Sequence, residues 1–257
     1  MSRIPRRSAL LAVGLVFAFV IPGTVSANHS WGGYHWARTS NPFTLKLGDN
    51  LTDPWHPYLA STSSDWSVSA VLDTTVVSGT AVKKLCSATT GTVQVCNSRY
   101  GNNGWLGVAT IRVSGNHITQ GTVKLNDTYF NTATYNTSAW RNMVMCQEVG
   151  HTLGLDHQDT IFDNPNLGTC MDYTNDPSTN QHPNTHDYEQ LVAIYSHLDS
   201  STTLASAPTS TGQSTGDATE AEWGRLVGVT NAGHGATYIL DLGAGNLIVT
   251  DVLWADR

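Results

Sequence analysis

Residues 147–157 read Q-E-V-G-H-T-L-G-L-D-H, and this stretch decides the fold of the chain. Residues four apart on a helix share one face, so Gln147 and His151 would point the same way, about 6 Å apart. Gly154 then ends the helix, because glycine tolerates the positive φ of a left-handed cap. After that turn, His157 approaches His151 from below. The stretch therefore predicts a helix, a turn and a second histidine folded back towards the first.

The side chains gathered in this way suit a metal ion. Catalytic zinc typically takes three protein ligands and keeps a fourth position for water, whose pKa falls to about 7. His151 and His157 offer imidazole nitrogens, whereas Gln147 offers only an amide oxygen, which is a weaker donor. Glu148 lies next to the same helix face and reaches a water molecule bound there. The spacing thus predicts a metal site with an acid–base group beside it.

The stretch differs at one position from the motif H-E-x-x-H-x-x-G-x-x-H, because Gln147 replaces its first histidine. Further along, residues 169–173 read T-C-M-D-Y, which looks like a methionine turn. With both elements, residues 145–173 resemble the metzincin clan of zinc metallopeptidases. The resemblance implies Zn²⁺ as cofactor, and it implies one role for each motif residue. These roles are metal ligands for Gln147, His151 and His157, general base for Glu148, and structural floor for Met171.

Gln147 leaves three interpretations open. It binds zinc through its amide oxygen and catalysis survives, or another group supplies the third ligand, or the site is degenerate and the chain is a non-catalytic relative. Glu148 favours an active enzyme, because a scaffold that only folds needs no carboxylate there. The histidines outside the motif that are available as replacement ligands are His29, His35, His56, His117, His182, His186, His197 and His234.

The first residues are typical of a secretory signal peptide. Three arginines precede an apolar run over residues 9–21, which is shorter than the ~20 residues that span a bilayer. Small residues at the −3 and −1 positions predict cleavage after Ala27. An N-terminal membrane anchor is the alternative. We expect residues 1–27 to be removed and the protein to be secreted.

Charge and hydropathy limit the classes of binding partner that are expected for this chain. Removal of residues 1–27 takes away three arginines and no acidic residue, so the formal charge changes from −7 to −10. Such an acidic chain is not expected to bind nucleic acid. The chain has no second long apolar run, so no membrane contact is expected after signal cleavage. The expected partner is a protein or peptide substrate, and the expected state is a monomer.

Four cysteines in an exported chain predict two disulfides. Sequence alone allows three pairings, and local pairing favours Cys86–Cys96 and Cys146–Cys170. The first pair flanks a stretch that is typical of a β-hairpin. The second would tie the motif helix to the methionine turn.

The order of patterns predicts an α+β fold, with a mixed twisted sheet, the motif helix, a methionine turn, a C-terminal helix and a short β-rich tail. The motif helix is expected to begin at Thr137 or Ser138, and residues 107–112 are the candidate edge strand that aligns an extended substrate. An ordinary core strand is the alternative for residues 107–112. The predicted units are a signal peptide (1–27), a metzincin-like catalytic domain (28–199), a Ser/Thr/Gly-rich linker (200–221) and a small β-rich segment (222–257).

These observations together predict a secreted zinc endopeptidase that hydrolyses peptide bonds with Glu148 as general base. The alternative is a non-catalytic secreted binding protein on a peptidase scaffold with a degenerate metal site. A carbohydrate-binding or cell-wall protein is a third possibility, because the chain has eight tryptophans and nine tyrosines.

Overall fold

The computed structural model describes residues 29–205, 222–230 and 233–255. The predicted signal peptide and most of the predicted linker (206–221) lie outside these residues. The described elements are β1 (His35–Trp36), β2 (Phe43–Asn50), α1 (His56–Trp66), β3 (Leu72–Ser78), β4 (Thr92–Ser98), β5 (Trp105–Ser114), β6 (His117–Asn126), α2 (Asp127–Phe130), α3 (Ser138–Thr152), α4 (Thr185–Ile194), β7 (Arg225–Val229), β8 (Gly235–Gly243) and β9 (Asn246–Trp254).

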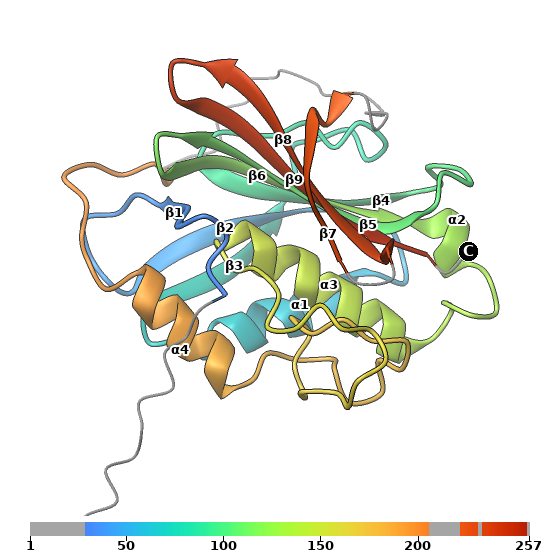
Figure 1. The fold of residues 1–257 in the computed structure, drawn as a ribbon. Helices are drawn as coiled ribbons and strands as arrows, with labels where there is room; N and C mark the ends of the chain where they lie inside the picture. Colours follow the sequence, from blue (N-terminus) through green and yellow to red (C-terminus); the bar gives the residue numbers. More distant parts are fainter. Residues whose placement is uncertain (1–28, 206–221, 231–232, 256–257) are drawn as a thin grey trace, which may run out of the picture.

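One large mixed sheet organises the fold. Its strand order is β3-β2-β4-β6-β5-β9-β8-β7, and β1 pairs separately with β6. Strands β2, β3, β4 and β6 run parallel, whereas β5, β9, β8 and β7 follow one another in antiparallel pairs. Figure 1 shows α1, α3 and α4 on one side of this sheet. The architecture is therefore α+β, with a large mixed sheet and few helices.

Helix α3 begins and ends where local chemistry predicts. The Thr137 hydroxyl accepts a hydrogen bond from the Trp140 N–H at 3.2 Å and caps the first turn. Beyond the last turn, Gly154 has a φ of +94°, and a Cβ there would lie 2.2 Å from the carbonyl oxygen of Tyr34. Only glycine fits such a close backbone approach at positive φ, so the predicted glycine turn is confirmed.

The segment that carries Met171 packs beneath α3. A disulfide joins Cys146 of the helix to Cys170, next to Met171. A Cβ on Gly150 would lie 2.6 Å from the Met171 sulfur, so the helix and the methionine are in close contact. The disulfide and this contact together hold residues 170–171 against the motif helix.

The stretch between Cys86 and Cys96 is not a β-hairpin, and that prediction was wrong. The two cysteines are bonded, but only residues 92–98 form a strand, β4. This strand pairs in parallel with β2 and β6 and is almost fully buried. Strand β4 buries polar side chains such as Gln94 and Asn97 as well as apolar ones, so the local alternation did not reveal that both of its faces are covered.

Strand β5 is not an exposed edge. Strand β9 pairs antiparallel with β5 along its length, with Ala109 opposite Asp251. Val249 and Leu253 of β9 belong to the same apolar core as α3. The tail thereby covers backbone groups of β5 that an open edge would expose. The expectation of a free edge over residues 107–112 does not hold in this structure.

No helix in the described part of the chain is both long enough and apolar enough to cross a membrane.

Candidate metal centre

His151 and His157 face each other through their Nε2 atoms. These two atoms lie 3.1 Å apart, and both side chains are buried. Each Nδ1 faces an acceptor: the Leu155 carbonyl lies 2.9 Å from His151 Nδ1, and the Asp156 carboxylate lies 3.3 Å from His157 Nδ1. An imidazole that donates from Nδ1 presents a lone pair at Nε2. Two lone pairs then point at one another, and a cation placed between them would bind both.

Asp251 of β9 supplies a third donor. Its Oδ1 lies 3.7 Å from His151 Nε2 and 4.0 Å from His157 Nε2. The other oxygen, Oδ2, accepts a hydrogen bond from the Thr237 hydroxyl at 2.8 Å, whereas Oδ1 has no well-aligned hydrogen-bond partner among the described residues. We call His151, His157 and Asp251 the buried cluster. Its donor atoms lie within 4.8 Å of one another, close enough to hold one metal ion.

The sequence contained a signal for Asp251 that was missed. Residues 247–254 read L-I-V-T-D-V-L-W, so a single carboxylate stands inside an otherwise apolar strand. A buried carboxylate is costly unless it is paired or binds a metal. The histidines proposed as replacement ligands do not join the buried cluster within the described chain, where the third group is an aspartate.

Gln147 lies one helical turn before His151 and is fully buried. Neither its amide oxygen nor its amide nitrogen has a hydrogen-bond partner among the described residues. Leaving such a group unsatisfied costs about 1–3 kcal/mol. An oxygen donor kept available in this way is compatible with a metal ligand, and the role of Gln147 stays a prediction.

Glu148 is enclosed between α3 and β5. A Cβ on Gly107 would lie 2.3 Å from its Oε1, so the absence of a side chain at residue 107 makes room for the carboxylate. Neither oxygen has a well-aligned hydrogen-bond partner in the described part of the chain. Burial raises the pKa of Glu148 well above its usual value, the charge of Asp251 adds to the rise, and the Ala109 backbone acts in the opposite direction. Glu148 thus belongs to the same enclosed environment as Asp251.

Tyr173 forms one wall of the buried cluster. Its ring stacks on His157 with ring centroids 4.1 Å apart. Its hydroxyl reaches β8, because a Cβ on Gly235 would lie 1.8 Å from that oxygen. Burial, and then the charge of Asp251, raises the pKa of Tyr173 well above its usual value. The sequence shows an Asp-Tyr pair after Met171, but nothing in it indicates the contact of Tyr173 with His157.

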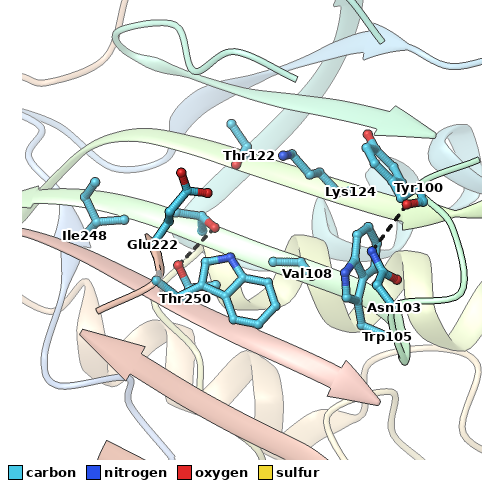
Figure 2. A pocket seen from close by; sticks show the side chains of 11 residues that line it. Tyr100, Asn103, Trp105, Val108, Thr122, Lys124, Glu222, Ile248 and Thr250 are labelled. Carbon is cyan, nitrogen blue, oxygen red and sulfur yellow. Dashed lines mark hydrogen bonds between the residues drawn. The ribbon is translucent and has the colours of Figure 1, made fainter. Parts of the chain in front are cut away.

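A pocket lies on the other face of the sheet (Figure 2). Val108 and Thr250 line it, whereas their neighbours Ala109 and Asp251 point towards α3, because side chains alternate along a strand. The aromatic side chains of Tyr100, Trp105 and Trp223 complete one wall. None of the residues of the buried cluster lines this pocket.

The chain has distant similarity to metzincin-type zinc proteases of known structure. It is similar to myroilysin, with a TM-score of 0.37 and 12% identity, over 62% of this chain and 82% of that one. It is also similar to high choriolytic enzyme 1, a hatching-enzyme zinc-protease from Oryzias latipes (medaka fish), with a TM-score of 0.34 and 9% identity, over 63% of this chain and 94% of that one. No protein-family model and no curated protein matches the sequence.

Proposed function

We propose that the chain is a secreted zinc-dependent endopeptidase and that the described arrangement is its closed form. The observation that supports this most directly is the meeting of His151 Nε2, His157 Nε2 and Asp251 Oδ1. All three atoms are acceptors when each histidine donates from Nδ1. Three such atoms meeting in a buried space form a favourable place for a cation.

The donor set fits zinc. Two imidazoles and one carboxylate form a ligand set that catalytic zinc sites use. Two nitrogens bound to one tetrahedral zinc ion at about 2.0–2.1 Å stand about 3.4 Å apart, which is close to the 3.1 Å between the two Nε2 atoms. Zinc, when bound, supplies a Lewis acid that polarises a scissile carbonyl.

The other catalytic and structural roles belong to residues of the chain itself. Glu148 takes a proton from the attacking water and passes it to the leaving amine, a role for which a raised pKa is suited. Met171 packs under α3 and keeps the helix in place. In the cleaving form Gln147, His151 and His157 would hold the ion, and in the closed form Asp251 would be added.

The closed form follows from the position of β9. An extended peptide substrate binds most simply by adding a strand to a sheet edge. Beside Glu148 that edge belongs to β5, and β9 already pairs with it. Cleavage therefore requires β9 to leave β5, and Asp251 leaves with it.

A second candidate function is a non-catalytic secreted binding protein with a degenerate metal site. The covered edge of β5 and the complete burial of Glu148 favour it. The aromatic pocket of Figure 2 offers it a separate surface for a ligand. A degenerate site can still bind zinc weakly, so an activity measurement is needed to separate the two candidates.

The test loosens β9 without substituting any residue of the buried cluster. Thr250 lies in the middle of β9, between Thr110 of β5 and Tyr238 of β8. Thr250→Pro removes a backbone donor from the sheet, whereas the matched control Thr250→Val keeps it. With zinc present, we expect Thr250→Pro to cleave casein faster than the wild type and than Thr250→Val. A chelator, or Glu148→Ala added to Thr250→Pro, is expected to abolish the cleavage.

The opposite result favours the second candidate. If Thr250→Pro is folded and binds zinc but cleaves no casein, the chain works by binding. Binding of the wild type to insoluble polysaccharide, lost on Trp105→Ala, would then assign the ligand to the pocket.

A further inference from the structure

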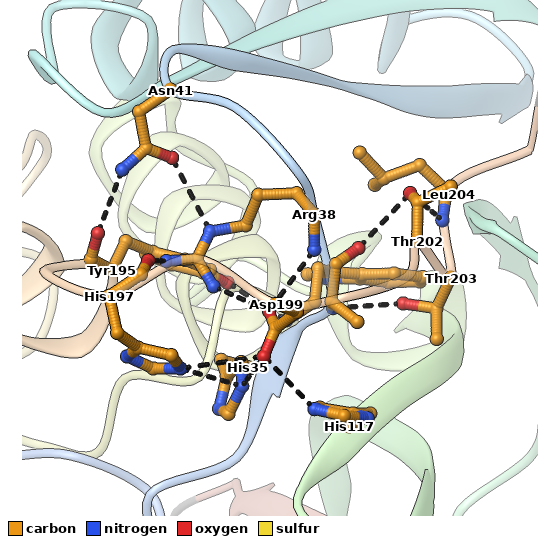
Figure 3. A network of polar contacts seen from close by, with 12 residues as sticks. His35, Arg38, Asn41, His117, Tyr195, His197, Asp199, Thr202, Thr203 and Leu204 are labelled. Atoms are coloured by element: carbon orange, nitrogen blue, oxygen red, sulfur yellow. Dashed lines mark hydrogen bonds and ion pairs between the residues drawn. The ribbon is translucent and has the colours of Figure 1, made fainter.

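A second group of metal-binding side chains lies elsewhere in the fold. It consists of His35 in β1, His117 at the start of β6, and His197 and Asp199 after α4. We call these four residues the three-histidine cluster. Figure 3 shows the three imidazole rings gathered around the Asp199 carboxylate. The cluster shares no residue with the buried cluster, so the proposal below does not depend on the proposed peptidase.

All three imidazoles approach one carboxylate oxygen through Nε2. Asp199 Oδ1 lies 3.2 Å from Nε2 of His117, 3.5 Å from that of His35 and 3.7 Å from that of His197. His35 Nε2 and His197 Nε2 lie 3.1 Å apart. The ring of His35 is almost perpendicular to those of His117 and His197, at 81° and 88°. The donor atoms of His35, His117 and Asp199 all lie within 4.8 Å of one another, and His197 Nε2 joins them beside His35 Nε2 and Asp199 Oδ1.

The contacts around His35 and Asp199 leave donor atoms available to a cation. His35 Nδ1 lies 3.0 Å from the Gly33 carbonyl, which can only accept, so His35 presents a lone pair at Nε2. The other carboxylate oxygen, Asp199 Oδ2, accepts hydrogen bonds from the Arg38 backbone N–H and from Arg38 Nη1 at 3.2 and 2.8 Å. His35 Nε2 and Asp199 Oδ1 are therefore two acceptors that face each other at 3.5 Å. Neighbouring imidazoles can donate to each of them, His197 Nε2 to His35 Nε2 at 3.1 Å and His117 Nε2 to Asp199 Oδ1 at 3.2 Å. A cation among these atoms would take the place of those two protons.

We propose that His35, His117, His197 and Asp199 bind a second divalent metal ion, with zinc as the best chemical match. Three imidazole nitrogens and one carboxylate oxygen fill the four positions that zinc takes in a closed site. Such a site has no position left for substrate, so its role is structural.

The structural role follows from the segments that the ion joins. His35 and His117 stand opposite each other where β1 pairs with β6. His197 and Asp199 belong to the segment after α4, which runs on to pair Ala205 with Gly91. One ion would fasten the beginning of the described chain, the β5–β6 turn and the segment that leads to the tail.

The experiment counts metal ions in the purified full-length chain, with Co²⁺ and Zn²⁺ as probes. We expect two equivalents in the wild type, one in His197→Ala and one in His157→Ala. The matched control is His56→Ala. Its side chain is 47% exposed against 48% for His197, and it also contacts aspartate, Asp49. His56→Ala should keep both equivalents.

Cobalt absorption in the visible region gives a second readout. In His157→Ala the remaining Co²⁺ should show the intense bands of a four-coordinate site, and adding His197→Ala should remove them. His117→Gln provides an independent variant in case His197→Ala fails to fold, and it should also lose one equivalent. The proposal is overturned if folded His157→Ala, in which the buried cluster lacks a ligand, binds no metal ion. It is equally overturned if folded His197→Ala or His117→Gln binds as many equivalents as the wild type.

Discussion

The two histidine clusters use the same kinds of donor atom in different settings. The buried cluster has two imidazoles and one carboxylate, with Glu148 enclosed nearby. The three-histidine cluster has three imidazoles and one carboxylate, and two of its rings are partly exposed. In the proposed cleaving form, which Asp251 has left, the first keeps one of the four zinc positions free, whereas the second fills all four. In the roles proposed for them, ligand number and a neighbouring base, rather than histidine content, distinguish the catalytic site from the structural one.

The largest effect is expected at Gly154, because the buried cluster depends on its turn. Gly154→Ala places a methyl group 2.2 Å from the Tyr34 carbonyl at a φ of +94°. We expect a loss of about 3 kcal/mol in the free energy of unfolding, from left-handed strain and displaced backbone. Gly168→Ala is the control. Gly168 also has a positive φ, +74°, but a Cβ added there has no neighbouring atom within 4 Å, so this substitution costs only the backbone strain. Equal losses in the two variants, measured by urea unfolding, would contradict the steric argument.

Asp251→Ala tests whether the tail contributes a ligand to the closed form. Removing a direct ligand should weaken zinc at the buried cluster by more than the 10–100-fold typical of groups that only orient ligands, so about 100-fold or more is expected. Zinc at the three-histidine cluster should not change. Competition with a chromogenic chelator measures both affinities. Asp241→Ala, on the neighbouring strand β8, is the control, and an equal drop in both variants would exclude Asp251 as a ligand.

Asp156→Asn tests how each cluster orients its rings. Asp156 faces His157 Nδ1 at 3.3 Å, whereas the corresponding acceptor for His35 is the backbone carbonyl of Gly33. Weakening this acceptor should lower zinc affinity at the buried cluster by about 10- to 100-fold. The same chelator titration should find the second site unchanged. An unchanged first site would mean that the Leu155 carbonyl and the disulfide suffice to orient the ligands.

The smallest effect is expected for Gln147→His. Imidazole is a better zinc donor than an amide oxygen, so this substitution should tighten zinc at the buried cluster by about tenfold, or 1.4 kcal/mol. Gln190→His, on α4, controls for an added buried histidine. No change in affinity would place Gln147 outside the set of ligands.

The local parts of the site could be read from the sequence, and the long-range parts could not. The capped helix, the glycine turn and the meeting of His151 with His157 all lie within residues 137–157. Asp251 reaches them only because β9 pairs with β5, and alternation gives neither the partner nor the register of a strand. The histidines of the second cluster are 162 residues apart at their extremes, and nothing local groups them. The two disulfides in the structure are the local pairs, which is why spacing was a good guide to them.

The tail that closes β5 is part of the same chain, and this sets how the closure responds to concentration. Ala205 is held at Gly91, and sixteen residues (206–221) separate it from the next described segment. A segment tethered by a short linker has an effective concentration in the millimolar range. Dilution therefore does not open the site, and a second molecule competes poorly with the tethered strand. A single cut within residues 206–221 would turn the same contact into a bimolecular one, which is released at low concentration.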